Sequence, residues 1–272
     1  MRPILICCYL AVCLTSCYEA STGCLDPDAD NYDLLADEGC TDCCTYPTLS
    51  VRSTVVWQDT AVVAGQTYRD GAGHDFQLIR FRYYLGDLRL ESAAADLPDP
   101  SRSVTLLEVL DGDTSQVTVN GNYLLATTAS VTTTGVGTVN TGVNPLTSLS
   151  GSYGLPDRYR NVIPASAPSG DALRTQAGRL NFRDGRGYVQ ARLEYTLPTQ
   201  ADTLSVSSFG STPFEIDFGG GIVRVRGADI RLDMYADLHA LLGTIDLTSD
   251  SATIANGLGR TTEFLSVVGI TQ

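Results

Sequence analysis

The sequence predicts an all-β protein, built as an antiparallel β-sandwich of immunoglobulin-like or jelly-roll-like type. Three observations support this prediction. Beyond Pro47, short runs rich in Val, Ile, Thr, Tyr and Phe follow one another, many of them alternate apolar with polar residues, and turn-forming residues separate them. A chain of 272 residues is long enough to bury one sizeable core of this kind.

The first residues predict export and attachment to a lipid. Arg2 precedes an apolar run, and the letters LTSC that end at Cys17 resemble the bacterial lipobox. The apolar run has about eleven residues, whereas a helix needs about 20 to span a bilayer. We therefore expect residues 1–16 to be a signal peptide and Cys17 to be the lipidated N-terminus. The lipid would anchor the chain to the bacterial outer membrane, on its periplasmic or its surface face.

Residues 17–47 form an acidic, cysteine-rich segment that we expect to act as a stalk or cap. Between Tyr18 and Pro47 there are eight acidic residues and no basic one. An even number of cysteines in an exported segment predicts two disulfides, with three possible pairings. The adjacent cysteines are expected to pair with the two earlier ones rather than with each other. The cysteines are Cys24, Cys40, Cys43 and Cys44.

The same segment spaces its carboxylates in a way that suggests a calcium loop. Oxygen ligands at alternate positions suit a hard cation. However, Asn31 stands where an EF-hand loop has its glycine, and the twelfth residue is an aspartate rather than a glutamate. The alternative is a solvated acidic spacer, and the segment resembles the Cys/Asp-rich motif of bacterial surface lipoproteins, which implies a stalk or cap. The candidate calcium ligands are Asp26, Asp28, Asp30, Asp33 and Asp37.

The predicted sandwich occupies residues 48–272. Asn120-Gly121 lies between two β-prone runs and predicts a hairpin turn, and the letters DGRG at residues 184–187 predict another. We expect strands at residues 49–57, 76–84, 88–90, 104–109, 116–128, 188–196, 214–218, 222–226 and 228–234.

Two further segments complete the expected domain. Residues 135–178 lack a clear period and are rich in Gly, Ser, Thr, Pro and Asn, so we expect an ordered excursion over the sandwich and the first place to search for a ligand site. Residues 235–242 predict one short helix, with Gly243 at its C-terminus.

Several segments resemble the MbnP-like domain, a copper-associated secreted β-sandwich, in the expected order over most of residues 49–268. The resemblance implies a copper site built on histidine and an oxidised tryptophan, with a Met/Trp-rich segment before the strand that begins GY. Here that segment reads GDALRTQAGRLNFRDGRGY, without Met or Trp, so none of the family's ligands is assigned to this chain. The segments are FQLIRFRYYLGDLRLES after VVWQDTAVVAGQTYRDGAG, then LLEVLDGD, GYVQARLEYTL, IRLDMYADLHALLGTIDL and IANGLGRTTEFLSVV.

The chain has two histidines, His74 and His239, and these are its candidate copper ligands. Imidazole and thioether groups are the usual ligands of copper. His74 lies in the turn-like stretch GAGHD, where the ring can meet a metal or solvent. His239 lies among leucines on the predicted helix, which also suits a partly buried histidine without a metal.

Composition narrows the classes of function. All 18 basic residues are arginines, which excludes Schiff-base chemistry on lysine and the P-loop lysine, and a net charge of −13 without a basic cluster argues against nucleic acid. No nucleophile motif is visible, so no catalytic residue is assigned. We predict a non-enzymatic envelope lipoprotein that binds a small ligand or an envelope protein. The alternatives are a periplasmic or surface copper-binding protein and a glycan-acting hydrolase with a pair of carboxylates.

Overall fold

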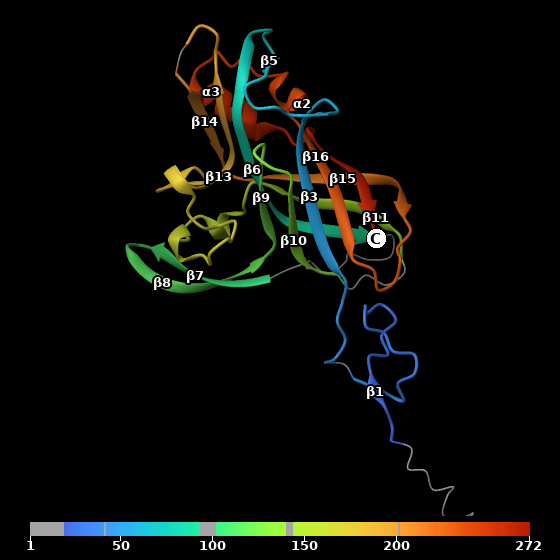
Figure 1. Ribbon diagram of the computed structural model, residues 1–272. Coiled ribbons are helices and arrows are strands. Elements are labelled where there is room, and N and C mark those ends of the chain that lie inside the picture. Colours follow the sequence, from blue (N-terminus) through green and yellow to red (C-terminus); the bar gives the residue numbers. More distant parts are fainter. Residues whose placement is uncertain (1–18, 41, 93–101, 140–143, 201) are drawn as a thin grey trace, which may run out of the picture.

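Two β-sheets packed face to face form the body of the protein, as Figure 1 shows for this computed structural model. The structure describes residues 19–40, 42–92, 102–139, 144–200 and 202–272, so the predicted signal peptide and Cys17 lie outside the described residues. Side chains of both sheets share one large hydrophobic cluster, here called the main cluster, which includes Leu49, Phe81, Leu193 and Leu232. The predicted all-β sandwich is therefore confirmed.

The smaller sheet has the order β10-β3-β16-β17, and β4 pairs with β3. Its strands are mainly antiparallel, as expected, while β3 and β16 run parallel, a pairing that the sequence did not indicate. The strands are β3 (Thr48–Trp57), β4 (Thr60–Ala61), β10 (Thr132–Thr138), β16 (Ile230–Asp237) and β17 (Leu265–Thr271).

The larger sheet has the order β12-β13-β6-β11-β15, with β14 on β13 and both β5 and β9 on β6. β6 is a single strand of 18 residues that joins the two predicted strands 76–84 and 88–90, and Figure 1 shows it bending as it passes through the sheet. The strands are β5 (Thr67–Arg69), β6 (Asp75–Ser92), β9 (Tyr123–Thr127), β11 (Leu146–Tyr153), β12 (Phe182–Arg183), β13 (Gly187–Thr196), β14 (Leu204–Phe209) and β15 (Thr212–Ile222).

A separate hairpin of β7 (Arg102–Leu110) and β8 (Asp113–Gly121) corrects one turn prediction. Its turn is Asp111-Gly112, where both residues have positive φ, as a tight two-residue hairpin requires. Asn120-Gly121 is not a hairpin turn, because β8 pairs with β7 and the following β9 pairs with β6. The predicted turn at residues 184–187 is confirmed, since it joins β12 to β13.

The segment 135–178 is only partly the excursion we expected. Its beginning belongs to β10 and β11, whose Thr and Ser residues suit edge and half-buried strand positions. Residues 154–178 are ordered and cover a second hydrophobic cluster, in which Tyr84, Tyr123, Tyr159 and Tyr188 are buried. It contains three short 3-10 turns, η1 (Asp157–Tyr159), η2 (Pro164–Ser166) and η3 (Ala177–Arg179).

The helices also differ from the prediction. The expected helix at 235–242 begins only at Leu238, because the preceding residues pair with both neighbouring strands as the end of β16. A second helix was not predicted. The helices of the described residues are α2 (Leu238–Leu242) and α3 (Ser251–Arg260), and neither is both long and apolar enough to cross a membrane.

The predicted strand at 222–226 is wrong beyond its first residue. β15 ends at Ile222, after a run of glycines in which Gly219 and Gly221 have positive φ. The next backbone groups bond to a side chain instead of a strand: Gln272 accepts from the N–H of Val225 at 2.6 Å and donates to the carbonyl of Val223 at 2.9 Å.

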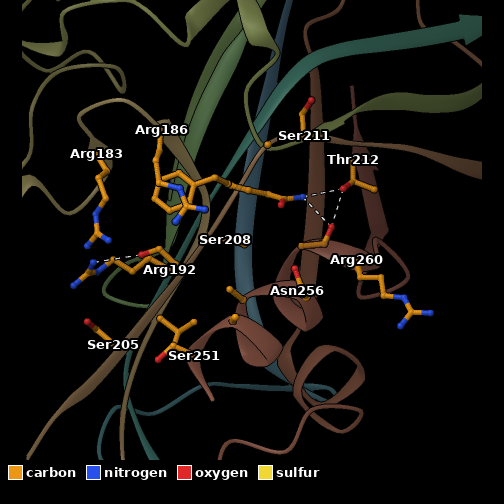
Figure 2. A pocket seen from close by; sticks show the side chains of 18 residues that line it. Arg183, Arg186, Arg192, Ser205, Ser208, Ser211, Thr212, Ser251, Asn256 and Arg260 are labelled. Carbon is orange, nitrogen blue, oxygen red and sulfur yellow. Dashed lines mark hydrogen bonds between the residues drawn. The ribbon is translucent and has the colours of Figure 1, made fainter. Parts of the chain in front are cut away.

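The acidic segment at the N-terminus forms a small module, which Figure 1 shows below the sandwich. It has a two-stranded parallel sheet of β1 (Thr22–Gly23) and β2 (Glu38–Gly39). Cys24 bonds to Cys44 and Cys40 to Cys43, which agrees with the expectation that the two adjacent cysteines do not pair with each other. At the opposite end of the molecule, a pocket of about 970 Å³ lies between β13, β14 and α3 (Figure 2).

Candidate metal centre

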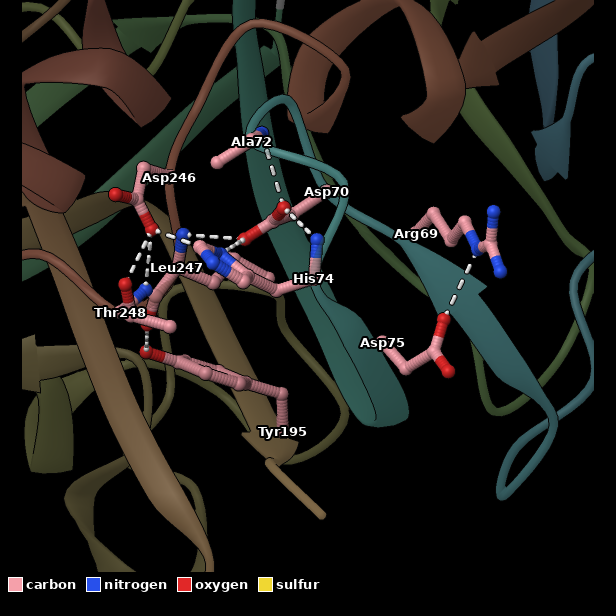
Figure 3. Close-up of polar contacts among 9 residues, drawn as sticks. All are labelled: Arg69, Asp70, Ala72, His74, Asp75, Tyr195, Asp246, Leu247 and Thr248. Atoms are coloured by element: carbon pink, nitrogen blue, oxygen red, sulfur yellow. Dashed lines mark hydrogen bonds and ion pairs between the residues drawn. The ribbon is translucent and has the colours of Figure 1, made fainter. Parts of the chain in front are cut away.

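The turn between β5 and β6 places His74 beside two carboxylates (Figure 3). Asp70 begins the turn, and its Oδ1 accepts hydrogen bonds from the backbone N–H groups of Ala72 at 3.0 Å and His74 at 2.8 Å. An aspartate that accepts from residues just after it stabilises a tight turn. The buried Asp70 therefore fixes the backbone that carries the imidazole.

A second segment, far along the chain, packs against this turn. The N–H of Gly71 donates to the carbonyl of Ile245 at 2.9 Å, and a Cβ at Gly71 would lie only 2.7 Å from the Ile245 nitrogen. Only glycine permits this approach without a shift of backbone. The contact brings Asp246 to the same side of the turn as His74.

The three side chains converge on one point. His74 Nδ1 lies 3.4 Å from Asp70 Oδ2 and 3.3 Å from Asp246 Oδ1, and the three ligand atoms lie within 4.8 Å of one another. The side chain of Asp70 has no exposed surface, while those of His74 and Asp246 are 47% and 41% exposed. The cluster is therefore anchored in the protein on one side and open to solvent on the other.

Neighbouring groups hold both carboxylates in place. Asp70 Oδ2 also accepts from the N–H of Leu247 at 2.8 Å, and Asp246 Oδ1 accepts from the hydroxyl and N–H of Thr248 at 2.6 and 2.8 Å. The Thr248 hydrogen bonds, side chain first, lower the pKa of Asp246, with a smaller contribution from His74. Beneath them, Tyr195 donates to the carbonyl of Leu247 at 2.8 Å, and burial is the main cause of its raised pKa.

This donor set fits a divalent transition metal. Tetrahedral zinc bound at about 2.0–2.1 Å separates its ligand atoms by about 3.3 Å, which matches both distances from the imidazole nitrogen. One imidazole and two carboxylates suit zinc or copper(II), whereas copper(I) prefers sulfur ligands. Three protein ligands leave a position for water or another ligand.

His239 lies outside this group. Its ring stands edge-on to Trp57, with the centroids 5.4 Å apart, and Trp57 in turn packs at a tilt against Tyr68, with the centroids 4.5 Å apart. Among the described residues, the group that gathers three potential metal ligands contains His74 and not His239. Sequence reasoning identified His74 as a candidate but missed Asp70 and Asp246. The Asp four residues before His74 was a local signal that could have been used.

The aspartates of the predicted calcium loop each have a partner of their own. Asp28 lies 3.6 Å from the guanidinium of Arg226, which belongs to the sandwich. Calcium binding by these residues stays a prediction. The others accept hydrogen bonds as follows: Asp26 from Tyr46 and from the N–H of Asp28, Asp30 from Thr45, Asp33 from the N–H of Leu35, and Asp37 from Ser21.

The fold and this cluster define a β-sandwich protein with a candidate metal centre at the edge of its larger sheet. The comparison with known families then identifies it: the profile of the MbnP family matches residues 46–257, and the chain belongs to that family. Among solved structures it is similar to MbnP from Methylosinus trichosporium, at 14% identity and a TM-score of 0.43, over 75% of this chain and 80% of that one. No curated protein matches the chain.

Proposed function

We propose that this member of the MbnP family is a binding protein of the bacterial cell envelope, and that Asp70, His74 and Asp246 hold a divalent transition metal. The observation that carries the proposal is the convergence of His74 Nδ1 on two carboxylate oxygens at 3.3 and 3.4 Å. The role is binding rather than catalysis. The open coordination position would let a bound ion pass to or from a partner.

Copper is the metal that the family resemblance favours, and the donor set narrows its oxidation state. Nitrogen and oxygen ligands favour copper(II), and the affinity of such a site for copper(II) generally exceeds that for zinc. The imidazole must be neutral to bind, so metal affinity falls as the pH is lowered.

Calorimetric titration of metal-free protein with copper(II) and with zinc(II) tests the proposal. We expect one ion per chain. Loss of an outer-shell partner of a metal ligand weakens metal binding by roughly 10- to 100-fold. His74→Ala removes a ligand itself, so it should weaken binding by at least that much. His239→Ala is the matched control and should leave the titration unchanged.

Three results would contradict the proposal: no uptake of either ion, unchanged binding by His74→Ala, or loss of binding only in His239→Ala. Circular dichroism of both variants checks that neither substitution has disturbed the fold. The substitution spares Asp70, whose carboxylate holds that turn.

We further propose that the chain is exported and anchored by a lipid on Cys17, in the outer membrane. The supporting features are the lipobox-like letters LTSC and the two disulfides of the N-terminal module, which belong to an oxidising compartment. Mass spectrometry of the native protein should find residues 1–16 removed and Cys17 acylated. An intact Met1 would refute the proposal.

A further inference from the structure

The large pocket between β13, β14 and α3 has a charge opposite to that of the whole protein. The chain carries a net charge of −13, yet four arginines and no acidic residue line the pocket: Arg183, Arg186, Arg192 and Arg260. Figure 2 places the first three on one side and Arg260 on the other. Positive charge therefore flanks the pocket from two directions.

Three of these arginines have no carboxylate partner within ion-pair distance among the described residues. Arg192 bonds to Glu194 at 2.9 Å, and the nearby Asp184 pairs with Arg179 at 2.7 Å. Arg183, Arg186 and Arg260 are exposed, and Arg186 lies over the ring of Phe209 at 4.5 Å. Guanidinium groups bind carboxylates and sulfates through paired hydrogen bonds, so these three groups are available to an anion.

The wall between the arginines is rich in hydroxyl and amide groups. Six of the 18 lining residues are Ser or Thr, and Gln190 and Asn256 add two amides. Gln190 is buried and held by its own NH₂ group, which donates to Thr212 at 2.9 Å and to the carbonyl of Gly259 at 3.1 Å. The lining is thus mostly polar, and the Gln190 amide in it is held in place.

The basic surface continues beyond this pocket. A smaller pocket of about 220 Å³ shares Arg186, Phe209 and Gly210 with the large one and reaches Arg160 in the excursion. Its lining includes one acid, Asp157. The excursion, where we expected a ligand site, therefore borders the extension but not the main pocket.

We infer that this surface binds an acidic saccharide, that is, a hydroxyl-rich chain carrying carboxylate or sulfate groups. Arginines on two sides of the pocket can bind more than one negative group, and the Ser, Thr, Gln and Asn side chains can form hydrogen bonds with hydroxyls. The volume of the pocket is that of a large ligand site. The lining of the large pocket has no pair of carboxylates, which cleavage of a glycosidic bond requires, so the site binds the saccharide without hydrolysing it.

Titration of the full protein with four probes tests this inference: an oligogalacturonate, a chondroitin sulfate oligosaccharide, uncharged dextran and inorganic phosphate. We expect at least one acidic saccharide to bind, and dextran and phosphate to bind much more weakly. The double variant Arg186→Gln/Arg260→Gln should weaken the binding by about tenfold or more, because it removes two charge-assisted contacts. The matched control is Arg52→Gln, on the other sheet, whose side chain is 48% exposed and which should bind like the unchanged protein.

The probes and variants separate the outcomes. Binding of either acidic saccharide, lost in the double variant and kept in Arg52→Gln, supports the inference. Chondroitin sulfate carries sulfates in addition to carboxylates, so its stronger binding would show that sulfate adds to the affinity. Equal binding of phosphate would reduce the surface to a simple anion site and overturn it. So would equal binding of dextran, equal loss in both variants, or the absence of binding by both acidic probes.

Discussion

The sandwich and the N-terminal module are stabilised by different interactions. In the sandwich, many apolar side chains are fully buried. One of them, Leu232 in the central part of the smaller sheet, has no exposed surface. In the module, Leu34 and Leu35 are 75% and 85% exposed, and the buried hydrophobic residues among those described are Cys24 and Ala29. Burial stabilises the first region, while the second has almost no core.

The module instead relies on covalent and polar links. It contains two disulfides. Hydrogen bonds add to them: the side chain of Asn31 donates to the carbonyl of Cys43 and accepts from the N–H of Thr45. Segments too short to bury a core commonly depend on disulfides in this way. A further contact fixes the module to the sandwich: a Cβ at Gly227 would lie 2.9 Å from the carbonyl oxygen of Ala29. We therefore expect the two regions to unfold under different conditions.

Alkaline pH should have the largest effect, and only on the sandwich. Burial raises the pKa of Tyr83 to about 12, and burial also raises the pKa of Tyr153. Because these folded-state values lie above the ordinary value of 10.0, the stability they contribute is fully present below pH 10 and is lost as the pH rises through the folded-state pKa. Above about pH 12 the sandwich should unfold.

In the module, a hydrogen bond to Asp26 is the main cause of the raised pKa of Tyr46, which lies at the surface. Tyr46 should therefore ionise without unfolding the sandwich. Tyrosinate absorbance recorded together with circular dichroism measures both events, and Tyr46→Phe should remove part of the absorbance change that precedes unfolding. Ionisation of all tyrosines near pH 10, with the fold intact, would contradict the comparison.

Replacement of a leucine by alanine in each region should have the next largest effect on stability. Leu232→Ala should lower the free energy of unfolding of the sandwich by about 2–5 kcal/mol, because it leaves a cavity in the main cluster. Leu35→Ala should change it by no more than about 0.5 kcal/mol, since that side chain is already in solvent. Denaturant unfolding of both variants checks this, and equal losses would show that the module has a core after all.

Removal of one disulfide should have the smallest effect on the whole molecule, because its consequence is local. Cys24–Cys44 closes a loop of 20 residues, worth about 3 kcal/mol to the module. The variant Cys24→Ser/Cys44→Ser should speed hydrogen exchange in residues 19–47 and leave the Tm of the sandwich unchanged. A large fall in that Tm would mean that the two regions fold as one unit.

Several strands could be predicted closely because their pattern is local. The predicted strands 49–57 and 188–196 correspond to β3 and β13 within one residue at each end. Alternation of apolar and polar side chains reports a sheet with one buried face, whatever the strand pairs with.

Helix α3 could not be predicted in this way. Its residues include Gly257 and Gly259, which disfavour a helix by about 1 kcal/mol each. The helix forms because Ile254 and Leu258 are buried in the main cluster. Gly259 lies against Gln190 in this packing, and a Cβ there would lie 2.5 Å from Gln190 Oε1. Tertiary packing overrides local propensity here.

The sequence by itself determined the class of fold, the acidic and cysteine-rich module and the candidacy of His74, since alternation, composition and spacing are properties of neighbouring residues. Only the tertiary structure decided which groups face His74. The hydrogen bond from Leu247 to Asp70 joins residues 177 positions apart, and a gathering of arginines from two strands, the turn between them and a helix has no trace in local spacing. Sites of this kind arise where packed elements meet, so their chemistry depends on the folded arrangement rather than on any one segment.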